Sequence, residues 1–193
     1  MSAPTTPNAA PFRVTGDYTL DPDHTRFAFA ARHAMVTKVR GHFAEFTGMV
    51  HLDADDPSRS TAQVTIKTAS VDTGNDSRDE HLRTNDFLDM DKYPEITFSS
   101  TEVRRVDDEH FAVTGDLTIK ATTRQVTITF ELTGASVDRF GAQRLGFEGS
   151  LAVNRKDWGV SWNAPLEAGG MLVSERVTLD IDVAAVKQQQ MAA

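Results

Sequence analysis

Apolar and polar side chains alternate with a period of two along most of this chain. In RFAFAARH (26–33), Phe27, Phe29 and Ala31 share one face, while Arg26 and Arg32 share the other. Four apolar residues of VTITFEL (126–132) alternate in the same way with two threonines and a glutamate. Such alternation is typical of β-strands with one face in water and one face buried. The sequence therefore predicts antiparallel strands that each carry one apolar face.

The same pattern recurs between clusters of turn residues such as DADDPSRS, VDDEH, KATTR and DRFGAQ. It predicts about eight strands, within residues 26–33, 41–52, 61–70, 95–100, 111–120, 126–132, 145–153 and 177–183. No helical pattern is long enough to cover a sheet, so the apolar faces must meet one another in a closed barrel or a sandwich. We favour the barrel.

Three segments interrupt the strand pattern, at 33–39, 75–93 and 159–174. Loops as long as the last two are more often functional caps than simple connections. In NDSRDEHLRTNDFL (75–88), Ser77 and Glu80 fit a capping box, which predicts a short helix. On that helix Asp79 and Arg83 are spaced for an ion pair.

The charged side chains of 75–88 do not form a convincing metal or acid–base site. Asp79, Glu80 and His81 are consecutive, so on a helix they point about 100° apart and cannot converge on one ion. The chain contains no HExxH, GxSxG, P-loop or GxGxxG motif. We therefore predict no metal ligands, no cofactor and no catalytic residues, and interpret 75–88 as a structural or gating segment.

The composition limits the class of protein. A chain of 193 residues with 39% hydrophobic and 25% charged residues fits one globular domain. The absence of cysteine excludes disulfides and thiol chemistry. The net charge of -8 argues against a nucleic-acid or anionic-membrane partner. Neither a signal peptide nor a membrane anchor is visible, so we expect a cytoplasmic protein with disordered tails at 1–14 and 188–193 around a domain at 15–187.

Three side chains are candidates for chemistry at the strand ends. His33 continues the phase of Phe27 and Phe29 and should point inward, as a core residue or as a ligand contact. Arg155 is in phase with Val153, and is interpreted either as a buried partner of Asp79 or Asp157 or as a contact for the head group of a ligand. Trp158 fits either the core or the lining of a pocket. Periodicity alone does not distinguish a filled barrel from a hollow one.

Longer stretches resemble one known family. YTLDPDHTRFAFAARHAMVTKVRGHF, DTGNDSRDEHLRTNDFLDMDKYPEITFSST, VTGDLTIKATTRQVTITFEL and GFEGSLAVNRKDWG are similar to segments of the YceI family of polyisoprenoid-binding, lipocalin-like proteins. The most specific elements are Arg78-Asp79-x-His81-Leu82 and VNRKDWG. Ala121 departs from the family pattern, in which a glycine often precedes the threonine of the LTIKATT corner.

The resemblance implies an all-β fold: a single antiparallel eight-stranded lipocalin-like barrel with short helical flap segments. It implies an isoprenoid lipid or quinone as ligand, bound in the interior without catalysis, with transient membrane contact and a homodimer. Two alternatives are an enzyme that uses Asp79, His81 and His33 on an amphiphilic lipid, and a filled barrel that acts as an interaction module. The predicted ligand-binding residues are Phe27, Phe29, His33, Val64, Phe98, Phe130, Phe147, Arg155 and Trp158.

Overall fold

A computed structural model describes residues 14–167 and 169–188 of the chain. The strands are β1 (Gly16–Leu20), β2 (Arg26–His33), β3 (Thr37–Phe43), β4 (Phe46–Leu52), β5 (Thr61–Lys67), β6 (Val71–Asp72), β7 (Glu95–Arg105), β8 (His110–Ile119), β9 (Thr122–Val137), β10 (Gln143–Asn154) and β11 (Val173–Lys187). Helix α1 spans Asp76–Arg83, and 3-10 turns span Pro57–Arg59, Thr68–Ser70 and Arg155–Trp158. The predicted tails lie outside the described residues, apart from Val14 and Gln188.

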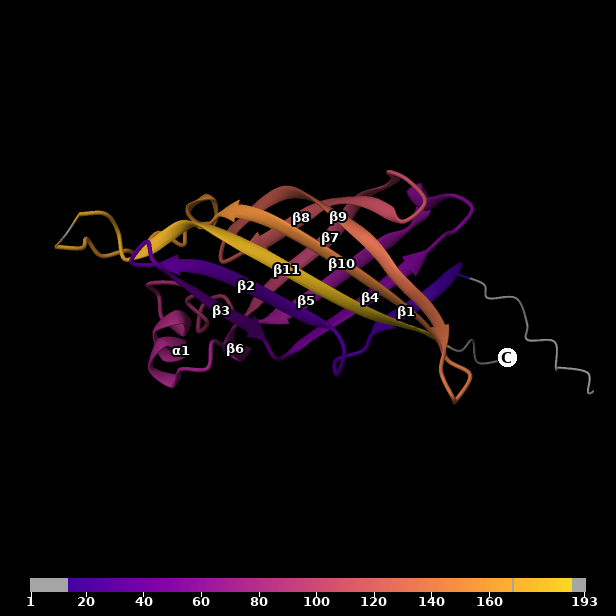
Figure 1. Cartoon of the computed structure of the whole chain (residues 1–193), viewed down its shortest axis with the longest axis horizontal. Helices are drawn as coiled ribbons and strands as arrows, with labels where there is room; N and C mark the ends of the chain where they lie inside the picture. The colour runs from indigo at the N-terminus through magenta and orange to yellow at the C-terminus, as the bar shows by residue number, and fades with distance from the viewer. Residues whose placement is uncertain (1–13, 168, 189–193) are drawn as a thin grey trace, which may run out of the picture.

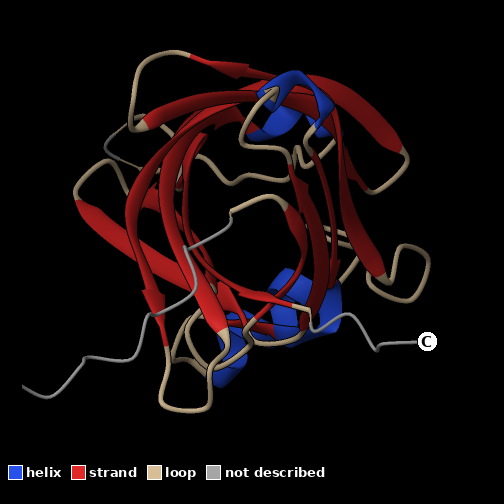
Figure 2. Ribbon diagram, turned by 90° about the vertical axis from the view of Figure 1, so that its right-hand side faces the viewer, coloured by secondary structure: helices blue, strands red, loops and turns tan. Residues whose placement is uncertain are grey.

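Eight of the strands close into a barrel, in the order β1-β4-β5-β7-β8-β9-β10-β11, and hydrogen bonds between β1 and β11 complete the ring. All pairings in the ring are antiparallel. Figure 2 shows the ring of strands end-on. Closure gives each ring strand a partner on both sides, which removes the exposed edges of an open sheet. The predicted all-β, eight-stranded antiparallel barrel is confirmed.

Three more strands extend the sheet beside β11. β2 pairs with β11 between residues 173 and 182, β3 pairs with β2, and the short β6 pairs with β3. Because β1 pairs with β11 only at residues 185–187, β2 is the neighbour of β11 along much of its remaining length. The elongated barrel and this three-strand extension are visible in Figure 1.

Several details of the predicted strands were wrong. The short β6 was not predicted, and residues 37–39, predicted as part of an interruption, belong to β3. Strand β1 was missed, because five residues are too few to establish a period of two. The predicted strand 41–52 is the end of β3 and all of β4, separated by Ala44 and Glu45. The backbone N–H of Ala44 donates to Ser70, and the carbonyl of Glu45 accepts from Lys67. The break at this turn explains the irregular alternation of the stretch.

Helix α1 lies at one end of the molecule, close to β3 and β6 (Figure 1). Its N-cap is Asn75, whose side chain accepts the backbone N–H of Arg78 at 2.9 Å. The predicted helix is therefore present, but the predicted capping box of Ser77 and Glu80 is wrong. Asparagine is as good an N-cap as serine, and it captures the same kind of free N–H group two residues earlier in the sequence.

The predicted ion pair between Asp79 and Arg83 is also wrong. Asp79 is buried and accepts hydrogen bonds from the backbone N–H (3.0 Å) and the hydroxyl of Thr73. Arg83 donates to the carbonyls of Ala69 (2.8 Å) and Val71 (2.9 Å). Both side chains thus fasten α1 to the segment that precedes it instead of to each other.

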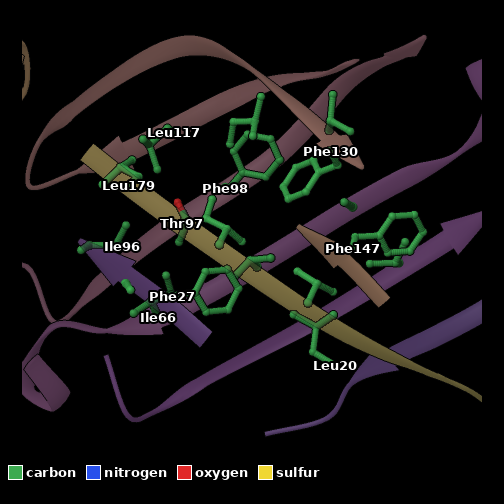
Figure 3. A pocket seen from close by; sticks show the side chains of 18 of the residues that line it. Leu20, Phe27, Ile66, Ile96, Thr97, Phe98, Leu117, Phe130, Phe147 and Leu179 are labelled. Carbon is green, nitrogen blue, oxygen red and sulfur yellow. The ribbon is translucent and has the colours of Figure 1, made fainter. Parts of the chain in front are cut away.

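The barrel packs tightly near its ends and loosely between them. One buried group contains Tyr18, Leu145 and Ala185, and another contains Ile96, Leu117 and Trp158. Between these groups, inward-pointing side chains such as Phe98, Phe130 and Phe147 (Figure 3) remain partly accessible. A side chain that points into a closed barrel stays accessible only where the interior is not filled. The barrel is therefore hollow.

Candidate functional site

A cavity of about 500 Å³ occupies the interior of the barrel. Every strand of the ring contributes to its wall, and the side chains labelled in Figure 3 converge on it from opposite sides. Nearly all lining side chains are aliphatic or phenyl groups, because the inward positions of the alternating strands are apolar. The volume falls within the range of about 300–1,000 Å³ that is usual for ligand pockets.

Seven of the nine predicted ligand-binding residues line this cavity. They are Phe27, Phe29, Val64, Phe98, Phe130, Phe147 and Arg155. The register explains why they converge: Val64 of β5 lies opposite Phe98 of β7, and Phe27 and Phe29 of β2 lie opposite Ile181 and Leu179 of β11. Residues opposite each other in an antiparallel pair point to the same face of the sheet.

His33 and Trp158 do not line the cavity, so their predicted placement is corrected. His33 has the inward phase of Phe29, but β2 runs past the last lining residue of that strand, Ala31, and leaves the imidazole exposed. Trp158 is only 3% exposed and packs with Ile96 and Leu117. Its indole N–H donates to the carbonyl of Leu117 at 3.0 Å. Trp158 is therefore a core residue, the alternative that the sequence left open.

Arg155 is a charged group in the otherwise apolar wall near the α1 end. It is 6% exposed and donates to the carbonyls of Ser174 (2.9 Å), Val160 (2.6 Å) and Val173 (3.4 Å). The interpretation of Arg155 as the buried partner of Asp79 or Asp157 is wrong: within the described residues its hydrogen bonds go to carbonyl oxygens. Burial lowers the pKa of the Arg155 guanidinium, and the negative charge of Glu175 opposes this effect.

Several lining residues were not predicted. Leu82, Phe87 and Leu88 close the cavity at the α1 end. Asp53, Arg105 and Asp108 line it at the opposite end, where Arg105 and Asp108 form an ion pair of 2.9 Å. A usable signal for the first group was that Leu82, Phe87 and Leu88 are the apolar residues of the otherwise polar stretch 75–88. No local pattern indicates that turn residues of β4–β5 and β7–β8 meet around one opening, because that contact depends on the closure of the ring.

An aromatic contact joins the two long interrupting segments. The imidazole of His81 lies edge-on to the indole of Trp162, with ring centroids 4.7 Å apart, and Phe87 lies 5.2 Å from Trp162. The Nε2 atom of His81 is 2.8 Å from a carboxylate oxygen of Asp86. We call this cluster of His81, Asp86, Phe87 and Trp162 the latch. Because Phe87 also lines the cavity, the latch fastens the flap, the segment 75–93 that contains α1, over the α1 end of the cavity.

The residues of the enzymatic alternative are each engaged in a different place. Asp79 is bound by Thr73, His81 belongs to the latch, and His33 is exposed at the end of β2. Among residues 14–167 and 169–188, no group of three or more His, Cys, Asp or Glu side chains is arranged to hold a metal ion. Within the same residues, no helix has the length and apolar character needed to span a bilayer.

These features define a class of protein: a closed antiparallel β-barrel with an apolar cavity in its interior and a short helical segment over one end of that cavity. Residues 18–185 match the YceI-like domain family, and the chain belongs to this family. Protein YceI of Shigella flexneri is 37% identical over 178 residues, which cover 91% of this chain and 90% of the relative.

Solved structures share the same fold. The crystal structure of Burkholderia cenocepacia BcnA superposes with a TM-score of 0.75 at 24% identity, over 86% of this chain and 98% of that chain. A polyisoprenoid-binding domain from Saccharophagus degradans superposes with a TM-score of 0.63 at 15% identity, over 89% and 98% of the two chains. Both similarities support the barrel architecture described above.

Proposed function

We propose that this protein binds a long-chain isoprenoid lipid, a polyprenyl phosphate or an isoprenoid quinone, for transport, storage or sequestration, without catalysis. The observation that carries the proposal is the apolar cavity inside the elongated barrel, whose wall combines side chains from every ring strand with only a few charged groups. Such a wall suits an uncharged hydrocarbon chain, which needs to leave water but needs no directional partners.

Burial of the tail would supply most of the affinity. An isoprene unit contains five carbons, and burial contributes about 0.8 kcal/mol per CH₂ equivalent, or roughly 4 kcal/mol for each unit before entropy costs. A few units therefore reach the practical limit of non-covalent affinity, at roughly -18 to -21 kcal/mol. Polar contacts would then determine which head group is bound and add little to the affinity.

The proposal is supported by the family. A solved neighbour of the same fold is described as a polyisoprenoid-binding domain, and the cavity of this chain has the apolar character that such a ligand requires. Phe27, Phe29, Val64, Phe98, Phe130 and Phe147 are our candidates for contacts to the tail.

Arg155 is our candidate for a polar contact to the ligand, because it combines a positive charge with a position in the cavity wall. If it binds a head group, Arg155→Lys will preserve much of the fold and weaken the binding of a polyprenyl phosphate more than that of the polyprenol with the same tail. An equal loss for both ligands, together with a loss of stability, would assign Arg155 to the structure alone.

The main experiment is native mass spectrometry of protein purified from its own host, followed by organic extraction. We expect a bound lipid with a mass series in steps of one isoprene unit. Titration of delipidated protein with a polyprenol and with an isoprenoid quinone provides the second measurement. Recovery of no lipid, combined with no uptake of either probe, would refute the proposal.

A cytoplasmic location and a homodimer stay predictions. Sedimentation velocity on the full chain tests whether the protein is a homodimer. We expect one species of twice the mass calculated from the sequence, and a species of 21.2 kDa would contradict the dimer.

A further inference from the structure

The hairpin between β2 and β3 carries an unusual combination of exposed apolar and cationic side chains. Met35 and Val36 at its turn are 64% and 77% exposed. Residues 26–43 contain no acidic residue, although the chain as a whole has a net charge of -8. The basic residues of this stretch are Arg26, Arg32, His33, Lys38, Arg40 and His42.

The register places like charges together on the outer face of this hairpin. Arg32 lies directly opposite Lys38, and Arg40 follows two residues later on the same face. Like charges directly opposite each other destabilise an isolated strand pair. In the part of the chain that the structure describes, no carboxylate forms an ion pair with Arg32, Lys38 or Arg40. An external anionic surface would relieve this repulsion.

The turn is held in position by the rest of the fold. Ala34 and Met35 adopt positive φ values of 50° and 63°, and the N–H of Ala34 donates to the carbonyl of Leu172 at 2.7 Å. Met171, which precedes Leu172, is itself 48% exposed. The structure therefore presents three apolar side chains beside the cationic ones at the end of the molecule that carries α1 (Figure 1).

We propose that this hairpin tip (residues 32–40), together with Met171, docks the protein on a membrane surface that contains anionic lipids. Apolar side chains at the turn would enter the interface, and the cations would lie at the level of the phosphates. The overall charge of -8 does not prevent such docking, because at about 0.1 M salt charges more than roughly 10 Å from the surface are largely screened.

Docking at this end has a consequence if the proposed lipid-binding function holds. The tip lies at the end of the barrel where Leu82 and Phe87 close the cavity. An isoprenoid tail could then pass between bilayer and cavity beneath the flap without crossing water. The docking itself is independent of the ligand and can be measured on the empty protein.

The test is co-sedimentation of the full chain with vesicles of phosphatidylglycerol and phosphatidylcholine, compared with vesicles of phosphatidylcholine alone. We expect binding to the anionic vesicles that weakens as salt is raised. Two double variants separate the contributions. Arg32→Gln with Lys38→Gln removes two charges and should lower the binding constant on the order of tenfold or more. Met35→Asn with Val36→Ser removes the apolar groups, and asparagine tolerates the positive φ of Met35.

The matched control is Phe140→Ser in the turn between β9 and β10, at the opposite end of the barrel (Figure 1). Phe140 is as exposed as Val36, at 77%. Arg139 stacks on the Phe140 ring at 4.7 Å, and the nearby Arg144 is bound by both Asp138 and Asp21, so the two cations here are balanced by two carboxylates, unlike the cations of the hairpin tip. We expect this variant to bind anionic vesicles like the wild type.

Three results would overturn the proposal: no binding of the wild type to either vesicle, unchanged binding of both double variants, or an equal loss for Phe140→Ser. A fourth result would replace membrane docking with a different role. If the wild type is a dimer that binds no vesicles, and both tip variants are monomers in sedimentation velocity, the tip joins two copies of this chain. Uptake of a polyprenol added from ethanol is measured in parallel. Failure of that uptake in the wild type would refute lipid binding by the cavity and leave the docking result valid.

Discussion

Trp158 and Arg155 lie within one 3-10 turn, Trp158 in the core and Arg155 in the cavity wall, and each shows how a polar group is accommodated among apolar side chains. The indole N–H of Trp158 and the guanidinium of Arg155 both donate to backbone carbonyls. Carbonyls at the ends of strands have free lone pairs, so they satisfy buried donors without a second charge. Arg155 therefore needs no acidic partner, which was one of the two interpretations that the sequence left open.

Replacement of Trp158 tests the distinction between core and cavity wall. Trp158→Phe removes the N–H group that binds Leu117 and leaves that buried carbonyl without its donor, so we expect a loss of about 1–3 kcal/mol in unfolding free energy. Ligand affinity should change little, because Trp158 does not line the cavity. Chemical denaturation and lipid titration measure the two effects. A large loss of affinity at unchanged stability would contradict the assignment.

The β7–β8 turn is an element whose stability should depend on pH. The backbone N–H of Glu109 and the side chain of His110 hydrogen-bond to Asp107, and these contacts lower the pKa of Asp107. The hydrogen bond that the His110 imidazole donates to the Asp107 carboxylate raises the pKa of His110. The contribution of His110 is complete below its ordinary pKa of 6.5 and is lost as pH rises through the raised value. The contribution of Asp107 to the stability of the turn is complete above its ordinary pKa of 3.8, and it is lost as pH falls through the lowered pKa of the folded state.

The turn is therefore expected to be most ordered between the two ordinary pKa values. NMR titration of the Glu109 and His110 amides, which donate to Asp107 at 2.9 and 2.8 Å, follows this directly. In His110→Gln the change on the alkaline side should disappear, while the acid transition of Asp107 should remain. An alkaline transition of the same size in the variant would assign it to another group.

The latch is the element that we expect to control exchange of the ligand. Trp162→Ala removes the contacts with His81 and Phe87, so the flap should open more often. We expect the dissociation rate of a bound polyprenol to rise several-fold with little change in the stability of the barrel, because the strand pairings do not involve Trp162. Stopped-flow transfer of a fluorescent isoprenoid to acceptor vesicles measures this rate. An unchanged rate would mean that ligand leaves at the other end, near Arg105 and Asp108.

At the scale of the whole molecule, the hollow interior changes what a substitution costs. In a filled core, a larger side chain forces its neighbours apart and costs typically about 1–3 kcal/mol. Val64 faces the cavity between Gly48 and Phe98, so Val64→Trp can extend into empty space. We expect less than about 1 kcal/mol of destabilisation, with a shorter maximum tail length bound. Denaturation curves and titration with polyprenols of increasing length test this, and a loss typical of a filled core would indicate a closed interior.

Much of the fold could be predicted from the sequence because strand pattern is local. Alternation identified six cavity-lining residues on five strands, β2, β5, β7, β9 and β10, and also Arg155 in the turn after β10, since the inward face of each strand is recorded in its own residues. The alternation of apolar and polar residues failed to predict the structure where a residue's position depends on contacts that are distant in the sequence. His33 has the right phase but lies beyond the rim, and five-residue β1 closes the ring only because the end of β11 is within reach.

The sequence by itself determined the class of fold: strands with one apolar face and no helical layer to cover them, which restricts the architecture to a closed barrel or a sandwich. The pairing of β1 with β11 in the tertiary structure selects the barrel. Only the tertiary structure decided that the interior is empty, which residues close its ends, and that a cationic, apolar turn projects beside one of them. The physical reason is that alternation specifies the direction of each side chain, whereas an unfilled volume depends on the distance between opposite walls, which the register and closure of the ring set together.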